Sequence, residues 1–331
     1  MYSIFVGCDI SKAYFDASYC STNKLIYLGR FDNQISGFKE MVRQLKQVTE
    51  SKSGSWMICF ENTGVYSKPL LEWLISQEIP CKEENALQIM KSSGLRRGKD
   101  DKIDSKMICR YAFEKRDSLK PSKLPSPKIT LLKKLLSRRT LMIKHKTALS
   151  NSLKEQKSIL DPDVYQTLND QNEELIEMYQ KHVDEINQQI EELMMSDEEL
   201  KKNYQLAQSV VGVGPVISAF VISFTENFQC FTEPRKFASF SGVAPFSNES
   251  GIKKGPKRVS HMANKQIKAL LSNAAQAAIQ YDPQIRGYYQ RKIAQGKHSG
   301  LIYNAIKNKL IHRVFAVIRR QTPYVKLPAY I

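Results

Sequence analysis

The chain has 331 residues, 42% of them hydrophobic, which is enough for two or three domains with ordinary cores. Its 50 lysines and arginines against 33 aspartates and glutamates give a net charge of +17, which predicts a polyanionic partner, either nucleic acid or an acidic membrane. The longest apolar stretch, residues 210–224, contains two glycines and a proline and is shorter than the roughly 20 residues of a membrane-spanning helix. These features argue against a membrane protein and favour nucleic acid as the partner.

The N-terminus and the cysteines indicate the compartment. The first ten residues, MYSIFVGCDI, contain no basic n-region and no cleavage signal for export. None of the six cysteines is paired at the CxxC spacing of a zinc site, and most lie in apolar segments. We therefore expect a reduced, cytoplasmic protein without a structural zinc ion.

The charge is unevenly distributed and indicates three structural units. Residues 1–119 are close to balance, whereas residues 120–160 carry 11 basic residues and 1 acidic residue. Residues 161–200 invert this pattern, with 1 basic and 13 acidic residues, and residues 201–331 are basic again. We expect domains over residues 1–120, 121–200 and 201–331.

The first of these units is predicted to be α/β. Three short segments rich in β-branched and aromatic residues are typical of an antiparallel meander: IFVGC (4–8), YFDASYC (14–20) and LIYLGRF (25–31). The apolar run WMICF (56–60) indicates a buried central strand, and a short strand is expected near 79–82. Apolar spacing predicts helices over 35–47, 65–77 and 101–116. Three antiparallel strands followed by alternating helix and strand is the order of an RNase H-like fold.

Beyond a proline-rich linker at 121–127, the pattern changes to long helices. A basic helix is expected over 128–160 and, after the DPD sequence at 161–163, a second helix that runs to about residue 195. The second helix carries apolar residues at alternating spacings of three and four over about three heptads: Ile176, Tyr179, Val183, Ile186, Ile190 and Leu193. This seam fits either an internal helical hairpin or a coiled coil that joins subunits.

The basic tail begins with two short helices, expected at 198–209 and 215–224, around the turn VVGVGP. A Gly-x-Gly turn between short helices is typical of a helix-hairpin-helix. There, the glycines (here Gly212 and Gly214) let backbone N–H groups approach a DNA phosphate. The alternative is a tight helix–helix turn without a ligand.

Four carboxylates fall at positions that such a fold brings together. Asp9 ends the first strand, Glu61 ends the central strand, and Asp101 and Asp104 begin a helix. Clustered carboxylates repel one another unless a hard divalent cation neutralises them, so the pattern predicts metal-dependent phosphoryl transfer with Mg²⁺ or Mn²⁺. Each residue has a structural alternative: Asp9 as a turn residue, Glu61 as a cap of the helix at 65–77, and Asp101 as a favourable charge at a helix N-terminus.

Six motifs together resemble one known family. The three acidic blocks are GCDISKAYFDA, CFENTGVY and GLRRGKDDKIDSKM, and the tail contributes SVVGVGPVISA, FASFSGVAPFSNESG and KRVSHMANKQIKALL. They resemble the DEDD-type transposases of bacterial insertion sequences, whose relatives include the pilin-gene DNA invertases and the bridge-RNA-guided serine recombinases. The similarity runs over nearly the whole chain, and the combination of motifs is specific where each alone is weak.

The resemblance implies an α/β RNase H-like N-terminal domain, a helical or coiled-coil segment and a mainly α C-terminal transposase domain. It implies that the acidic tetrad, Asp9, Glu61, Asp101 and Asp104, is catalytic and binds Mg²⁺ or Mn²⁺. Asp100 stands where the family usually has a small residue or threonine. The family pattern also places a serine nucleophile before a glycine in the tail, which is Ser250 in this sequence.

Ser250 is expected on a glycine-flanked loop, followed by cations that hold the phosphate: Lys253, Lys254, Lys257 and Arg258. A serine hydroxyl needs activation by a base or a metal, and the acidic tetrad is the expected source. A covalent phosphoserine stores the phosphodiester bond energy, so strands rejoin without ATP. The implied partners are double-stranded DNA, a guide RNA and further copies of the chain, as a dimer or tetramer, in the nucleoid of a bacterial cytoplasm.

Other interpretations remain open on the residues alone. Composition does not separate Ser250 from Ser241, Ser247 and Ser260; only the family pattern does. A resolvase-like nuclease would use the same tetrad to activate water, without a covalent adduct. An actin-like ATPase is suggested by VGCDIS but disfavoured by the charge of +17. A non-catalytic nucleic-acid-binding protein would show no response to metal.

Overall fold

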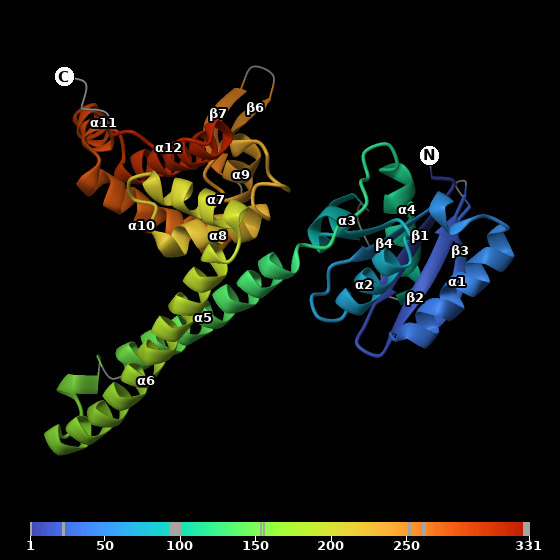
Figure 1. The fold of residues 1–331 in the computed structure, drawn as a ribbon, viewed down its shortest axis with the longest axis horizontal. Helices are drawn as coiled ribbons and strands as arrows, with labels where there is room; N and C mark the ends of the chain where they lie inside the picture. The colour runs from blue at the N-terminus through green and yellow to red at the C-terminus, as the bar shows by residue number, and fades with distance from the viewer. Residues whose placement is uncertain are drawn as a thin grey trace. The chain divides into compact units, whose positions relative to one another are not determined.

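The computed structural model describes residues 2–21, 24–92, 101–152, 154, 156–250, 253–259 and 263–326 (Figure 1). The chain divides into two compact units, Met1–Leu124 and Pro125–Ile331, at the proline-rich linker predicted from the sequence. Each unit is built around its own hydrophobic core. None of the helices in the described part of the chain is long and apolar enough to cross a membrane.

The first unit contains a five-stranded mixed sheet with the strand order β3-β2-β1-β4-β5. Strands β1, β2 and β3 form the antiparallel meander, and β4 and β5 continue the sheet parallel to β1. This order confirms the predicted RNase H-like fold. The strands are β1 (Ile4–Ile10), β2 (Tyr14–Cys20), β3 (Ile26–Asp32), β4 (Trp56–Glu61) and β5 (Cys81–Glu84).

Helices cover both faces of this sheet, because the central strands β1 and β4 are apolar on both sides. On one face, α1 and α2 pack against Val6, Ile58 and their neighbours, and on the other α3 and α4 pack against Phe5 and Met57. The helices are α1 (Ile35–Thr49), α2 (Lys68–Ser76), α3 (Ala86–Ser92) and α4 (Asp101–Glu114), with a short 3₁₀ turn at Ser53–Ser55 before β4.

Helix α4 lies unusually close to the sheet because Gly7 of β1 has no side chain. A Cβ atom at Gly7 would lie 2.1 Å from the backbone nitrogen of Cys109 and 2.3 Å from the carbonyl oxygen of Ser105. The Ser105 hydroxyl meets the Ser18 hydroxyl at 2.7 Å, and Ser18 is the cross-strand partner of Gly7. The contact fixes the position of α4 along β1 and β2.

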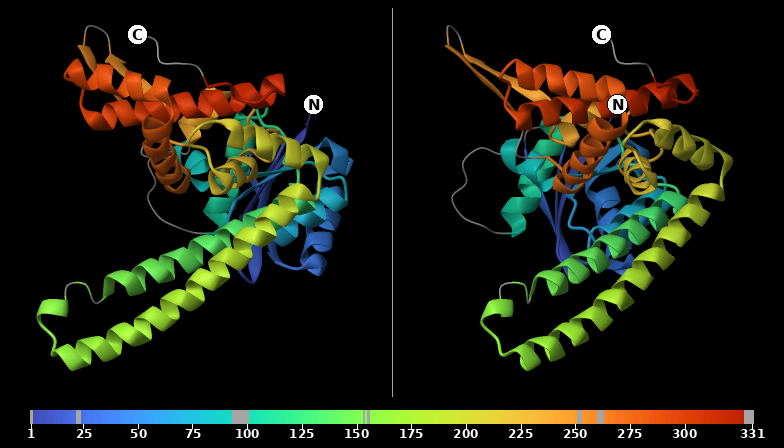
Figure 2. Two further views of the ribbon diagram at one scale, coloured as in Figure 1. Left: turned by 60° about the vertical axis from the view of Figure 1, so that its left-hand side comes forward. Right: turned by 90° about the vertical axis from the view of Figure 1, so that its left-hand side faces the viewer.

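The second unit begins with an antiparallel helical hairpin, formed by α5 (Pro127–Ser152) and α6 (Pro162–Met195) (Figure 2). A 3₁₀ turn at Gln156–Ser158 lies between them, so α5 ends before the predicted residue 160. Ile186 and Ile190 of the predicted seam are buried inside the chain's own core, together with tail residues such as Leu206. The hairpin therefore shares one core with the tail instead of forming a separate domain, and this part of the seam is internal.

The tail is mainly helical, as predicted, with one two-stranded antiparallel hairpin (Figure 1). Asn203 of α7 and Asn227, both buried, are joined by a hydrogen bond of 2.9 Å, which satisfies polar groups in an otherwise apolar core. The elements are α7 (Glu198–Ser209), α8 (Pro215–Thr225), α9 (Pro234–Phe240), β6 (Pro245–Ser250), β7 (Lys253–Val259), α10 (Lys265–Tyr281), α11 (Pro283–Ala294) and α12 (Ser299–Arg320).

Candidate active site

The candidate active site lies on the face of the sheet that α4 covers, at the carboxyl ends of β1 and β4. Side chains alternate between the two faces of a strand, so Asp9 shares the face of Gly7, and Glu61 shares the face of Cys59. Cys8 pairs with Phe60, so Asp9 and Glu61 are the next residues along these neighbouring parallel strands. Asp9 lies within β1 and pairs with β2, which excludes a turn role, and the N-cap of α2 is Ser67 and not Glu61.

The other two predicted carboxylates come from the first turn of α4. Asp101 is the first residue of the helix and Asp104 follows one turn later on the same side. Because the contact at Gly7 fixes α4 against β1, this first turn lies over the strand end that carries Asp9. Asp100, the neighbour of Asp101, lies outside the described residues.

The electrostatics of Asp9 show that the four carboxylates are neighbours. Burial, followed in order of importance by the nearby charges of Asp104, Asp101, Glu61 and Asp16, raises the pKa of Asp9 to about 6. The structure thus brings together all four residues that the sequence predicted. A fifth carboxylate, that of Asp16, also acts on Asp9; it is the cross-strand partner of Asp9, and sequence reasoning missed it.

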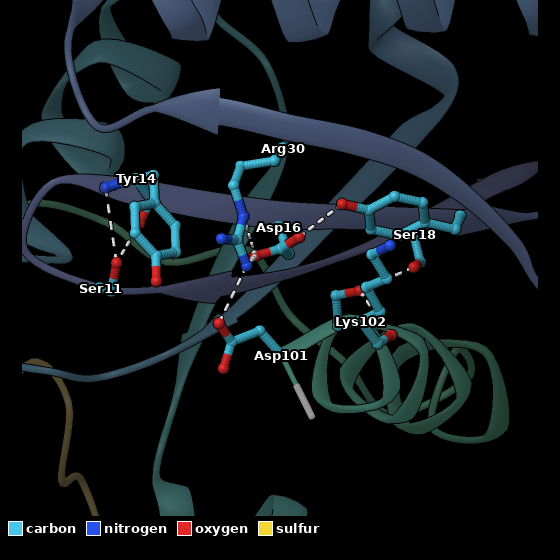
Figure 3. Close-up of polar contacts among 9 residues, drawn as sticks. Ser11, Tyr14, Asp16, Ser18, Arg30, Asp101 and Lys102 are labelled. Atoms are coloured by element: carbon cyan, nitrogen blue, oxygen red, sulfur yellow. Dashed lines mark hydrogen bonds and ion pairs between the residues drawn. The ribbon is translucent and has the colours of Figure 1, made fainter. Parts of the chain in front are cut away.

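Asp16 is buried and forms an ion pair with Arg30 of β3 (Figure 3). The guanidinium of Arg30 also donates a hydrogen bond to Asp101, with 3.0 Å between Nη2 and Oδ2. Arg30 therefore links the sheet to the first turn of α4. A charged residue within the otherwise apolar strand YFDASYC was the available signal, because a buried carboxylate needs a partner.

The donor set fits a hard divalent cation, since carboxylate oxygens are the ligands that Mg²⁺ and Mn²⁺ prefer. The raised pKa of Asp9 reflects its burial and the repulsion from neighbouring carboxylates, and a cation would relieve that repulsion. The ligands are nevertheless not assembled: within the described ranges, no three His, Cys, Asp or Glu side chains are grouped to hold one metal ion. Asp101 is instead paired with Arg30, at 3.0 Å.

Ser250 does not lie on the expected loop. It is the last residue of strand β6 and pairs with Lys253, the first residue of β7. The other three predicted phosphate-binding cations, Lys254, Lys257 and Arg258, also belong to β7, so the hairpin register brings Ser250 and these cations onto two adjacent strands.

The rival serines differ in their surroundings. Ser241 is fully buried, and its hydroxyl donates to the carbonyl oxygen of Phe237 at 2.8 Å, so it is engaged in ending α9. Ser247 lies on β6 with Ser250, and Ser260 lies outside the described residues. Burial and a satisfied hydroxyl make Ser241 a poor candidate for a nucleophile.

The two glycines of the helix-hairpin-helix pattern serve different purposes. Gly212 has a φ of +92°, and a Cβ atom there would lie 2.4 Å from the carbonyl oxygen of Ala274 in α10. Gly212 is therefore required by packing. Gly214 has no atom within 4 Å of its Cβ position and precedes α8 without a side-chain cap. Packing thus explains Gly212 and leaves Gly214 as the glycine with space beside it.

Helices α11 and α12 form a basic cavity that sequence reasoning did not single out. The cavity has a volume of about 500 Å³ and is lined in part by Arg291 and Lys309. Both cations lie near the ring of Tyr288, at 5.9 and 4.8 Å from its centroid. Beyond Asp282, which is buried against Arg313, the sequence contains no acidic residue, and this was the available signal.

Comparison with known proteins decides the family. One family model, described as a transposase of the DEDD, IS110 type, matches residues 6–160, and another, described as transposase of the IS116/IS110/IS902 family, matches residues 204–290. The chain belongs to the IS110 family of transposases. As an IS110 transposase it is a phosphoryl-transfer enzyme that acts on DNA.

The similar proteins include two that invert DNA. The pilin gene-inverting proteins of Moraxella bovis and Moraxella lacunata are each 26% identical to this transposase over 98% of its chain and 99% of their own. An uncharacterized 43.6 kDa protein of insertion element IS110 from Streptomyces coelicolor is 29% identical over 37% of this chain and 30% of its own.

The raised pKa of Asp9 predicts how the stability of the metal-free transposase depends on pH. Because the folded state holds the Asp9 proton more tightly than the unfolded state, this contribution is present at low pH and is lost as the pH rises through about 6. We expect the free energy of unfolding in EDTA to increase by about 1 kcal/mol between pH 7 and pH 5, allowing for partial exposure. Asp9→Asn should remove this increase, whereas Asp117→Asn, at an exposed site, should keep it; equal profiles for both variants would contradict the assignment.

Proposed function

We propose that this transposase cuts and rejoins DNA through a covalent phosphoserine at Ser250, assisted by a divalent cation at the tetrad Asp9, Glu61, Asp101 and Asp104. The observation that carries the proposal is the crowding of these carboxylates around Asp9, whose pKa is raised to about 6 by burial and by the neighbouring charges. Carboxylates gathered at strand ends in a protein of charge +17 suit a reaction on a polyanion. Mg²⁺ and Mn²⁺ are the cations that this donor set favours.

In the proposed reaction, the tetrad holds the cation and Ser250 supplies the attacking oxygen. A bound divalent cation supplies Lewis-acid polarisation of the phosphodiester and charge neutralisation. The Ser250 oxygen loses its hydroxyl proton and forms a P–O bond as one strand P–O bond breaks, and the leaving strand oxygen takes up a proton. One phosphodiester replaces another, so the reverse attack reseals the strand without ATP. In this proposal the cations of β7, the strand paired with that of Ser250, neutralise the phosphate.

The protonation state of Asp9 determines whether its carboxylate can bind the cation. With its pKa raised to about 6, its carboxyl group is mainly ionised at neutral pH and protonated below pH 6. A proton on Asp9 competes with a cation for the same oxygen atoms. Metal affinity and strand cleavage should therefore both fall as the pH drops through 6.

A resolvase-like nuclease is the second candidate function. The acidic cluster belongs to the first unit alone, and the same carboxylates would serve the attack of water on the phosphodiester. The two functions differ in one product: only attack by serine leaves the protein covalently attached to DNA.

The Ser250 proposal is tested with a nicked suicide substrate carrying the element's ends, in Mg²⁺. Wild type should form a covalent adduct that resists denaturation, with the phosphate on Ser250. Ser250→Ala should lose the adduct completely and keep DNA binding, because it removes one hydroxyl; Ser247→Ala is the matched control on the same strand. Asp104→Asn should also lose the adduct. An adduct of wild-type yield from Ser250→Ala would refute the assignment, and cleavage with no adduct in any variant would favour the nuclease.

We further propose that duplex DNA and a guide RNA contact the basic surfaces of the second unit, including the cavity of Arg291 and Lys309. Each phosphate contact contributes about −0.9 to the slope of log affinity against log salt on duplex DNA. Arg291→Gln with Lys309→Gln should reduce the slope by about 1 to 2 on the nucleic acid that occupies this cavity. Parallel titrations with duplex DNA and structured RNA identify which one it is. The charge-matched control, Lys39→Gln with Lys46→Gln on α1, should change neither slope; equal slopes for both double variants would remove the cavity from the interface.

We also propose that the chain acts as a homo-oligomer, a dimer or a tetramer. Five large apolar side chains on α6 are exposed: Val164, Leu168, Leu175, Met178 and Met195. Leu175→Asp with Met178→Asp should reduce the mass measured by light scattering, because charges would then lie in the contact between copies. Ile186→Asp is unsuitable for this test, since Ile186 is buried within the chain. An unchanged mass would remove α6 as the contact.

A further inference from the structure

The carboxylate of Asp16 is an anchor with both oxygen atoms occupied (Figure 3). The Asp16 side chain is 1% exposed, and its Oδ1 accepts a hydrogen bond from the hydroxyl of Tyr27 at 2.5 Å. Its Oδ2 accepts from Nε and Nη2 of Arg30 at 3.0 and 2.8 Å. A buried carboxylate satisfied in this way is held in place, and its charge holds the guanidinium. Asp16 is therefore not a spare metal ligand, although it faces the same site as Asp9.

Arg30 is fixed at the Asp16 end and accessible at the other. The Nη2 atom that donates to Asp16 also donates to Oδ2 of Asp101, at 3.0 Å. The side chains of Arg30 and Asp101 are nearly half exposed, at 46% and 44%. The guanidinium also lies over the ring of Tyr14, with 3.9 Å between Cζ and the ring centroid. Water therefore reaches the contact with Asp101, whereas the contact with Asp16 is protected from it.

We propose that Arg30 is a positioning residue of the active site: it neutralises Asp101 in the metal-free protein and competes with a divalent cation for that carboxylate. The proposal rests on the metal-assisted function proposed above. Without a cation, four crowded carboxylates destabilise one another, and a guanidinium beside Asp101 offsets part of that repulsion. When Asp101 turns toward a cation, Asp16 retains Arg30 at the edge of the site. The same contact accounts for a tetrad that converges on Asp9 and yet is not assembled as a ligand set.

The proposal predicts the direction in which metal affinity changes. Arg30→Gln should bind Mn²⁺ about three- to tenfold more tightly than wild type in the absence of DNA, because a partly exposed ion pair contributes of that order. In EDTA, the same variant should unfold at a lower temperature than wild type. Arg43→Gln is the matched control: Arg43 pairs with Glu40 on the surface of α1 and should alter neither quantity. A purely structural role for Arg30 would weaken metal binding instead.

Charge-balanced variants separate direct competition from a general change of the electrostatic field. Asp16→Asn with Arg30→Gln leaves the net charge unchanged and keeps an oxygen that accepts from Tyr27. Arg30→Lys keeps the charge and removes the guanidinium fork that reaches both carboxylates. Because Arg30 is half exposed, this variant should fold even if substitution of the buried Asp16 unfolds the protein. Under direct competition, both variants bind Mn²⁺ more tightly than wild type.

Titration of free Mn²⁺ by electron paramagnetic resonance measures these affinities on the full chain. Tighter binding by Arg30→Gln and by the charge-balanced variants supports the proposal. Tighter binding by Arg30→Gln alone would reduce the effect to net charge and overturn it, as would unchanged or weaker binding. If wild type binds no Mn²⁺ while it remains folded, the metal-assisted function fails, and the role of Arg30 fails with it.

Discussion

Electrostatic repulsion among carboxylates at one edge of a sheet is the constraint on which the first unit depends. Asp9, Glu61 and the buried Asp16 lie on the sheet face that α4 covers, and Asp101 and Asp104 lie in the first turn of α4. The resulting penalty appears in the pKa of Asp9, which burial and these neighbours raise to about 6. The fold holds them there through a close contact elsewhere, where α4 packs against the bare backbone of Gly7. Packing thus holds like charges close together, which is typical of a site that binds a cation.

The second unit supplies the complementary charge. Its tail contains no acidic residue after the buried Asp282, and the hairpin of β6 and β7 places Ser250 next to a strand of lysines and arginine. The internal core that joins the α5–α6 hairpin to the tail makes this unit a single body that presents basic surfaces. The acidic cluster around Asp9 and the basic tail therefore belong to different units, which suits a reaction on a substrate that is itself a polyanion.

Local patterns predicted the fold better than they predicted the site. Apolar runs located the strands, and their order gave the RNase H-like sheet, because those patterns reflect burial directly. The β6–β7 hairpin was missed, since PFSNES and KKGPKRV lack the apolar alternation of a strand. Arg30 and Asp16 were missed because their contact depends on the register between β2 and β3, and register is set by the whole sheet. The Gly-x-Gly pattern was ambiguous because Gly212 serves packing and Gly214 is open.

The central claim is that the four carboxylates of the first unit converge on one divalent-cation site. Anomalous X-ray diffraction from crystals of the transposase grown with Mn²⁺ tests it most directly. The account predicts an anomalous peak at about 2.0–2.2 Å from carboxylate oxygens of Asp9 and at least one residue of the first turn of α4, with Asp101 turned away from Arg30. A Mn²⁺ peak bound elsewhere in the chain, with Asp9 and Asp104 free of metal, would contradict it.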